Sequence, residues 1–316
     1  MTRRHGLLAL SLFLSAGSIL SPAQTSGNLS SSLLTAARGA ASQAETGHCP
    51  AALTILTRAA GHLTDRDLEK RVELDGVRCA TLLQSWSQLT DFARALQRDF
   101  PRDPDALYAV VHAWSDLSTH AAEELARTAQ GSIPALELDA EANEVQGRWD
   151  AAEKDYRAIL KDNPRYPGIH FRLARLLLSR PNPGPDFQEQ AKEELQTELR
   201  IDPSNAGAEY ISGELARQMQ DFPAAVEHFS KASTLDPNFG DAFLGLGMTL
   251  LSEKKYEDAV APLETAVKLE PGNPAGHYSL ATAYARTGHK EAAEREFALQ
   301  QQTAQQGNAP EATSPQ

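Results

Sequence analysis

The stretch FPAAVEHFSKASTLDPNFG at residues 222–240 returns 34 residues later as YEDAVAPLETAVKLEPGNP at residues 256–274. Both copies carry an alanine, a large apolar residue four positions on, and a proline eight positions after that. An earlier copy ends at Pro203, so that three such prolines follow one another at intervals of 34 residues. A fixed period of this length predicts a solenoid of stacked helical pairs.

The unit at residues 240–273 indicates how one repeat folds. Apolar residues from Phe243 to Leu250 follow the spacing of a single helix face. A polar turn at residues 252–255 leads into a second apolar helix, which Pro271 ends. Each repeat is therefore predicted to be a helical hairpin that buries its apolar side against its neighbours.

This outline resembles the tetratricopeptide repeat, W-x2-L-G-x2-Y…A-x3-F…P over about 34 residues. The matching residues of one unit are Phe243, Leu246, Gly247, Leu250, Ala259, Leu263 and Pro271. The resemblance implies an all-α, right-handed solenoid of antiparallel helix pairs. Five units are expected, at about residues 133–166, 167–205, 206–239, 240–273 and 274–303. The second of these is five residues longer than its neighbours, because of the proline-rich loop PNPGP at residues 181–185.

The chain before residue 133 keeps the pattern only weakly. Residues 33–132 are predicted to be degenerate helical repeats, in which residues 104–132 form a shortened pair of helices; a helical domain without repeat phase is the alternative. The polar segments at residues 24–32 and 304–316 are predicted to be disordered.

The first 23 residues have the layout of a secretory signal peptide. Arg3 and Arg4 precede an apolar run from Leu7 to Leu20, and small residues stand before Gln24. The alternative is a single membrane anchor, but the run is shorter than the roughly 20 residues that a spanning helix needs. We therefore expect an exported protein, periplasmic or secreted, without a membrane span after cleavage.

The chain contains two cysteines, Cys49 and Cys79. An even number in an exported protein predicts a disulfide, and two buried free thiols are the alternative. In the repeat register, Cys49 begins the second helix of one pair and Cys79 lies late in the next helix, so the two could face each other.

Charge and motifs exclude several classes of function. The chain has 42 acidic and 30 basic residues, a net charge of −12, which disfavours binding to nucleic acid and to anionic membranes. It lacks the motifs of zinc proteases, serine hydrolases and P-loop enzymes. His112 and His120 have no third ligand at a suitable spacing. We therefore predict no enzyme activity, no cofactor and no metal.

The resemblance implies that the first helix of each pair lines a concave groove, with its fifth, ninth, twelfth and thirteenth residues facing inward. The residues predicted to contact a partner are Phe171, Arg175, Tyr210, Glu214, Arg217, Leu244, Met248, Tyr278, Thr282 and Arg286. Aromatic and arginine side chains are common anchors of interfaces. Packing against the adjacent helix is the alternative for each position.

The sequence thus predicts a non-catalytic scaffold or assembly factor of the bacterial envelope, which binds a peptide segment or helix of another protein in its groove. Neither the partner nor the pathway follows from the residues. The alternative is a carbohydrate- or cell-wall-associated module, or the accessory subunit of an envelope enzyme. A glycan-binding module would need exposed aromatic residues gathered on one face, and the three tryptophans are Trp86, Trp114 and Trp149.

Overall fold

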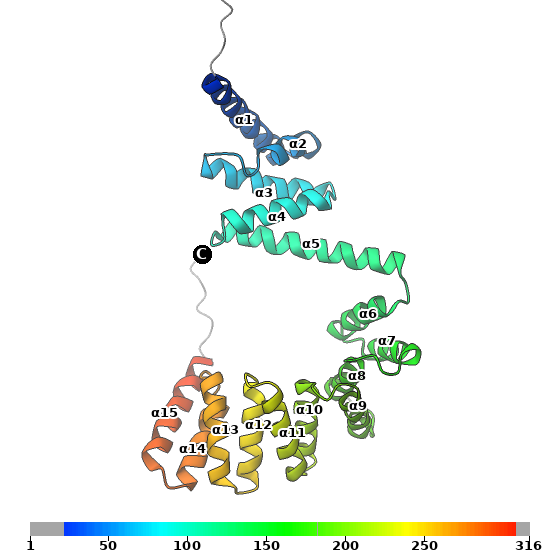
Figure 1. Cartoon of the computed structure of the whole chain (residues 1–316), viewed down its shortest axis with the longest axis vertical. Helices are drawn as coiled ribbons and strands as arrows, with labels where there is room; N and C mark the ends of the chain where they lie inside the picture. The colour runs from blue at the N-terminus through cyan, green and yellow to red at the C-terminus, as the bar shows by residue number, and fades with distance from the viewer. Residues whose placement is uncertain (1–21, 182, 308–316) are drawn as a thin grey trace, which may run out of the picture. The chain divides into compact units, whose positions relative to one another are not determined.

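The computed structural model describes residues 22–181 and 183–307, and within them it contains fifteen helices and no strand (Figure 1). The chain divides into two compact units, Met1–Thr128 and Ala129–Gln316. Among the described helices, none combines the length and apolar character that a bilayer crossing requires. The signal peptide expected at residues 1–23 lies almost entirely outside the described residues.

The first unit consists of two helical hairpins and one long helix. Its elements are α1 (Pro22–Glu45), α2 (Cys49–Ala59), α3 (Arg66–Leu82), α4 (Trp86–Asp99) and α5 (Pro104–Thr128). The ring of Phe92 on α4 fills the core at Gly76 of α3, where an added Cβ would lie 2.4 Å from that ring. The absence of a side chain at Gly76 therefore lets the two helices of this hairpin approach closely.

Two predictions for this region are wrong. Residues 24–32 are helical, because α1 begins at Pro22, a favoured first helical position, and meets no further proline before its end at Glu45. Residues 104–128 form one continuous helix, α5, instead of a shortened pair. No glycine or proline stands between Asp105 and Thr128 to start a turn, so one helix continues through the segment.

The second unit consists of five consecutive hairpins, and each unit predicted from residue 133 onward contains two helices. The elements are α6 (Ile133–Val145), α7 (Trp149–Asp162), α8 (Ile169–Ser179), α9 (Phe187–Ile201), α10 (Ala206–Gln218), α11 (Phe222–Leu235), α12 (Gly240–Ser252), α13 (Tyr256–Leu269), α14 (Pro274–Arg286) and α15 (Lys290–Gly307). Residues 304–307 were expected to be disordered, but α15 includes them. Residues 308–316 lie outside the described residues.

One kind of turn closes hairpins in both units. A residue with positive φ follows the first helix of six hairpins, and these residues are Gly47, Gln84, Gly147, Gln220, Lys254 and Gly288. In each case the next residue donates its backbone N–H to the carbonyl oxygen five residues earlier, as from Lys255 to Leu250. This arrangement satisfies a carbonyl at the end of the first helix and reverses the chain. The hairpins of the first unit therefore share their closing geometry with those of the second.

Neighbouring repeats of the second unit approach closely around the ring of Phe229. An added Cβ at Gly213 of α10 would lie 2.8 Å from the ring of Phe229, and one at Gly245 of α12 would lie 2.6 Å from it. The fully buried ring of Phe229 on α11 thus lies against both first helices. This packing explains why α10 and α12 both carry glycine at these positions.

Candidate functional site

The first helices of neighbouring pairs in the second unit contact one another. Besides contacting their own second helices, α8, α10, α12 and α14 contact one another in sequence along the chain (Figure 1). The ten predicted partner-binding residues all lie on these four helices.

The ten residues differ in exposure. Arg175, Tyr278 and Arg286 are exposed. The other seven are half-buried, and these are Phe171, Tyr210, Glu214, Arg217, Leu244, Met248 and Thr282. Tyr278 leaves 57% of its surface exposed, which makes it the most accessible aromatic side chain of the set. These ten residues, called the groove row below, therefore include accessible side chains as well as side chains that pack the helices together.

Tyr210 illustrates the second kind. Its ring centroid lies 4.8 Å from that of Phe239 and 5.8 Å from that of Phe229. Phe171 packs in a similar way, because an added Cβ at Gly207 would lie 3.0 Å from its ring. Substituting either aromatic residue would therefore disturb packing as well as any contact with a partner.

The surroundings of Tyr210 are acidic. Burial and the carboxylates of Glu214 and Asp241 raise the pKa of Tyr210 to about 12. Burial and the nearby carboxylate of Glu270 raise the pKa of Asp241. Glu214 is paired with Arg217 at 2.7 Å, whereas Asp241 forms no ion pair with any residue that the structure describes. Negative charge consequently accumulates around Tyr210, in the middle of the predicted contact residues.

Asp241 and Glu270 were not among the predicted contact residues. Asp241 occupies the second place of its unit, whereas contact residues were predicted at the fifth, ninth, twelfth and thirteenth places. Glu270 follows α13, and its carboxylate lies where a side chain at Gly240 would stand. The approach of Glu270 to the start of α12 is a tertiary contact, and the sequence carries no local signal for it.

The ends of the row present cations and aromatic surface. Arg175 lies 3.4 Å from Glu144 in an exposed ion pair. The guanidinium of Arg286 lies 5.6 Å from the ring centroid of Tyr256. Tyr278 meets Phe297 edge-on, with ring centroids 6.0 Å apart. Both arginines are thus oriented by neighbours yet remain accessible to a ligand.

The two cysteines and the histidines His112 and His120 take part in contacts within the first unit. Cys49 and Cys79 form a disulfide with a Cα–Cα distance of 5.0 Å, which ties α2 to α3. His120 stacks on Trp86, with ring centroids 4.2 Å apart. His112 lies beside Tyr108. Within the described part of the chain, no group of three histidine, cysteine or acidic residues could hold a metal ion.

The tryptophans do not form an exposed aromatic platform. Trp86 is half-buried against the core of the first unit, and Trp149 is half-buried against the core of the second. Trp114 is exposed over 37% of its surface. Two of the three tryptophan rings therefore serve helix packing. Trp114 shares α5 with Tyr108, which is 69% exposed, so the three tryptophans by themselves do not form the aromatic face that the carbohydrate-binding alternative requires.

Comparison with known sequences identifies the repeats. Family models described as tetratricopeptide repeat match residues 140–206 and 210–274 in one version and residues 250–312 in another. Together these matches cover more than half of the chain. Comparison with curated proteins found no significant match.

Comparison with solved structures found other helical-repeat proteins. A double mutant of MamA from strain RS-1 is 14% identical, with a TM-score of 0.50 over 56% of this chain and 97% of its own. YrrB, described as a TPR protein with an unusual peptide-binding site, is 16% identical, with a TM-score of 0.49 over 60% of this chain and 94% of its own. PilF of Pseudomonas aeruginosa is 21% identical, with a TM-score of 0.47 over 54% of this chain and 76% of its own. At these identities the likeness bears on the fold alone.

Proposed function

Because this chain belongs to the tetratricopeptide repeat family, we propose that it is a non-catalytic scaffold whose concave groove binds a segment of a partner protein. Proteins with these repeats generally act as protein-interaction scaffolds. The proposal rests chiefly on one observation, the unpaired carboxylate of Asp241 beside Tyr210 on the inner side of the array.

The groove favours a segment with basic and apolar side chains. Asp241 and Glu214 would attract a lysine or arginine of the partner, and the accessible ring of Tyr278 offers apolar area in the same row. The net charge of −12 would strengthen the attraction between the scaffold and a basic segment at low salt. We expect the affinity to fall as the ionic strength rises.

Matched variants test this groove. Tyr278→Ala combined with Asp241→Lys should abolish capture of the partner from an envelope extract, because the pair removes an exposed ring and reverses an unpaired charge. Leu235→Ala combined with Asp258→Lys is the control: both residues are exposed, and both lie on second helices, away from the groove. Equal partner profiles for the two double variants would refute the groove as the binding surface.

We also propose that the protein is exported to the envelope. The basic start, the short apolar run and the small residues before Gln24 support this location, and the disulfide between Cys49 and Cys79 suits an oxidising compartment. Mass spectrometry of the protein recovered from a periplasmic extract should find a chain that begins at Gln24. An intact chain from Met1, recovered only from the cytoplasm, would contradict the proposal.

A further inference from the structure

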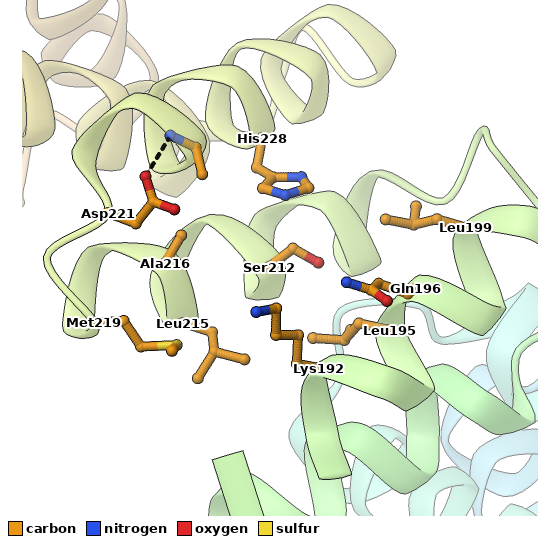
Figure 2. A pocket seen from close by; sticks show the side chains of 11 residues that line it. Lys192, Leu195, Gln196, Leu199, Ser212, Leu215, Ala216, Met219, Asp221 and His228 are labelled. Atoms are coloured by element: carbon orange, nitrogen blue, oxygen red, sulfur yellow. Dashed lines mark hydrogen bonds between the residues drawn. The ribbon is translucent and has the colours of Figure 1, made fainter. Parts of the chain in front are cut away.

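A cavity of about 110 Å³ lies between α9, α10 and α11, away from the predicted groove residues (Figure 2). Its apolar lining comprises Leu195, Leu199, Leu215, Ala216, Met219 and Ala224. Lys192, Gln196, Ser212, Asp221 and His228 complete it. Figure 2 shows Lys192 and Leu195 extending from α9 toward Ser212 and Leu215 of α10.

The repeat register explains why the cavity occurs at this hairpin. Ser212 and Ala216 occupy two positions of α10 that hold large apolar residues in the neighbouring first helices. The corresponding pairs are Leu173 and Leu177 in α8, Leu246 and Leu250 in α12, and Leu280 and Tyr284 in α14. One helix thus lacks two large side chains while its neighbours keep theirs, and the missing volume leaves an apolar hollow.

The hollow is on a different side of α10 from the groove. Tyr210, Glu214 and Arg217 belong to the groove row, whereas Ser212 and Met219 line the cavity together with residues of α9 and α11. None of the ten predicted partner-binding residues lines it. A ligand in the cavity would therefore leave the groove free.

Among the polar side chains at the cavity, the ammonium of Lys192 lacks an ion-pair partner within the described residues. His228 is held by Glu209 at 2.5 Å, and the carboxylate of Asp221 accepts the backbone N–H of Ala224 at 3.2 Å (Figure 2). The side-chain ammonium of Lys192, by contrast, forms no ion pair or hydrogen bond with any residue in the described ranges, and only part of its surface is exposed. The cavity thus holds a cation, Lys192, that can pair with an anionic group of a ligand, while the carboxylate of Asp221 accepts the backbone N–H of Ala224.

We propose that this cavity is a second docking site, which receives one branched aliphatic side chain of a partner polypeptide while an adjacent acidic residue of that partner pairs with Lys192. An apolar cavity of about 150 Å³ holds benzene, so 110 Å³ suits an isobutyl group. Met219, 49% exposed at the cavity, has the flexible side chain that can close over such a group. The site requires no ligand in the groove.

The methionines allow both sites to be followed in one experiment. The chain has three, Met1, Met219 and Met248, of which Met219 lines the cavity and Met248 belongs to the groove row. The full chain, labelled with 13C at its methionine methyl groups, is titrated with the probe acetyl-Asp-Leu-Asp-amide. We expect the Met219 signal to shift and the Met248 signal to remain in place.

Two control peptides separate the apolar and charged contributions. Acetyl-Asp-Ala-Asp-amide should bind about tenfold more weakly or worse, because it lacks the isobutyl group. Acetyl-Lys-Leu-Lys-amide should not shift Met219, because it places cations beside Lys192. Free 3-methylbutanoate carries the same aliphatic group on a small carboxylate, and a shift of Met219 at the same affinity as the peptide would overturn assignment to a polypeptide.

Variants test the cavity itself. Ala216→Leu restores the residue present in α8 and α12 and should abolish the Met219 shift while raising the melting temperature. Ala261→Leu, at an exposed position of α13, is the matched control and should bind as the wild type does. Lys192→Glu changes the rim and not the core, and should weaken the acidic peptide at least tenfold.

The remaining outcomes overturn the proposal. Wild-type affinity in Ala216→Leu would place the peptide elsewhere, as would a peptide that shifts Met248 alone. A Met219 shift that depends on protein concentration without any peptide would identify a second copy of the chain as the occupant. Because the groove variants leave this cavity intact, failure of the cavity titration and failure of the groove experiment can be told apart.

Discussion

Nδ1 of His277 on α14 lies 2.7 Å from Oε2 of Glu296 on α15, and His170 and Glu194 meet at 2.6 Å at the corresponding place of the α8–α9 hairpin. The Nε2 atom of each imidazole lies 3.0 Å from the carbonyl oxygen of a proline six residues earlier, Pro271 or Pro164. Both nitrogens of each buried ring therefore face an acceptor. In the α10–α11 hairpin the two residue types are exchanged, with Glu209 on the first helix and His228 on the second. The α12–α13 hairpin has Phe243 and Pro262 at these places and no such pair.

The contributions of His277 and Glu296 to the free energy of unfolding should depend on each other. Glu296→Leu leaves a buried imidazole without its carboxylate, and we expect it to lower the free energy of unfolding by about 3 kcal/mol. The double variant His277→Phe/Glu296→Leu should recover most of this loss, because Phe243 shows that a phenyl ring fits the position in α12. Urea unfolding followed by circular dichroism measures both. If the loss in the double variant equals the sum of the losses in Glu296→Leu and in His277→Phe, the residues do not act as a pair.

The first unit should lose stability as the pH rises. Glu73 on α3 is fully buried, and burial together with the adjacent carboxyl of Glu69 raises the pKa of Glu73 to about 8. The folded state thus favours the neutral acid: its contribution is complete below the unfolded value of about 4.5 and is lost as the pH rises toward 8.

Glu73→Gln removes this titration. We expect the variant to exceed the wild type in melting temperature at pH 8 and to show a flatter pH profile between pH 5 and 9, with up to about 1.4 kcal/mol removed per pH unit. Glu123→Gln, at an exposed position of α5, should leave the profile unchanged. Identical slopes for the wild type and Glu73→Gln would show that the carboxyl of Glu73 is not protonated in the fold.

Glycine at the turn positions with positive φ should raise the free energy of unfolding. Gln220 and Lys254 have φ of 62° and 64°, a region in which a Cβ costs about 1–2 kcal/mol. Gln220→Gly and Lys254→Gly should each raise the free energy of unfolding by about 0.5–1 kcal/mol, since glycine, already present at Gly147 and Gly288, adopts this conformation freely. Lys255→Gly is the control, because its φ of −85° suits any residue. Equal effects at Lys254 and Lys255 would contradict this account.

The disulfide should stabilise only the first unit. Cys49 and Cys79 are 30 residues apart, and opening a loop of this size should cost about 3 kcal/mol. Hydrogen exchange measured by mass spectrometry should show faster exchange in α2 and α3 of the Cys49→Ser/Cys79→Ser variant, with α8–α15 unchanged. Alkylation before and after reduction reports whether the bond is present in the isolated protein. Unaltered exchange in α2 and α3 would mean that the bond adds no stability there.

The hairpins from residue 133 onward could be predicted because their signals are local and repeated. Pro237 and Pro271 end second helices, and the intervening apolar spacing repeats with them. The segment of α5 was expected to follow the two-helix repeat, but no glycine or proline interrupts it, so it forms one helix. The cavity has a sequence signal, because Ser212 and Ala216 stand where the neighbouring first helices carry large apolar residues. The acidic surroundings of Tyr210 depend on the tertiary position of Glu270 and could not be inferred from spacing.

The size of Phe229 affects the spacing between the first helices α10 and α12. Its ring lies close to Gly213 of α10 and to Gly245 of α12, so one aromatic side chain packs against two adjacent first helices. A smaller residue there would let those helices tilt together and shorten the distance between Tyr210 and Leu244. The pitch of the scaffold, and with it the spacing at which a ligand's side chains must repeat, is in this way governed by a residue that no ligand touches.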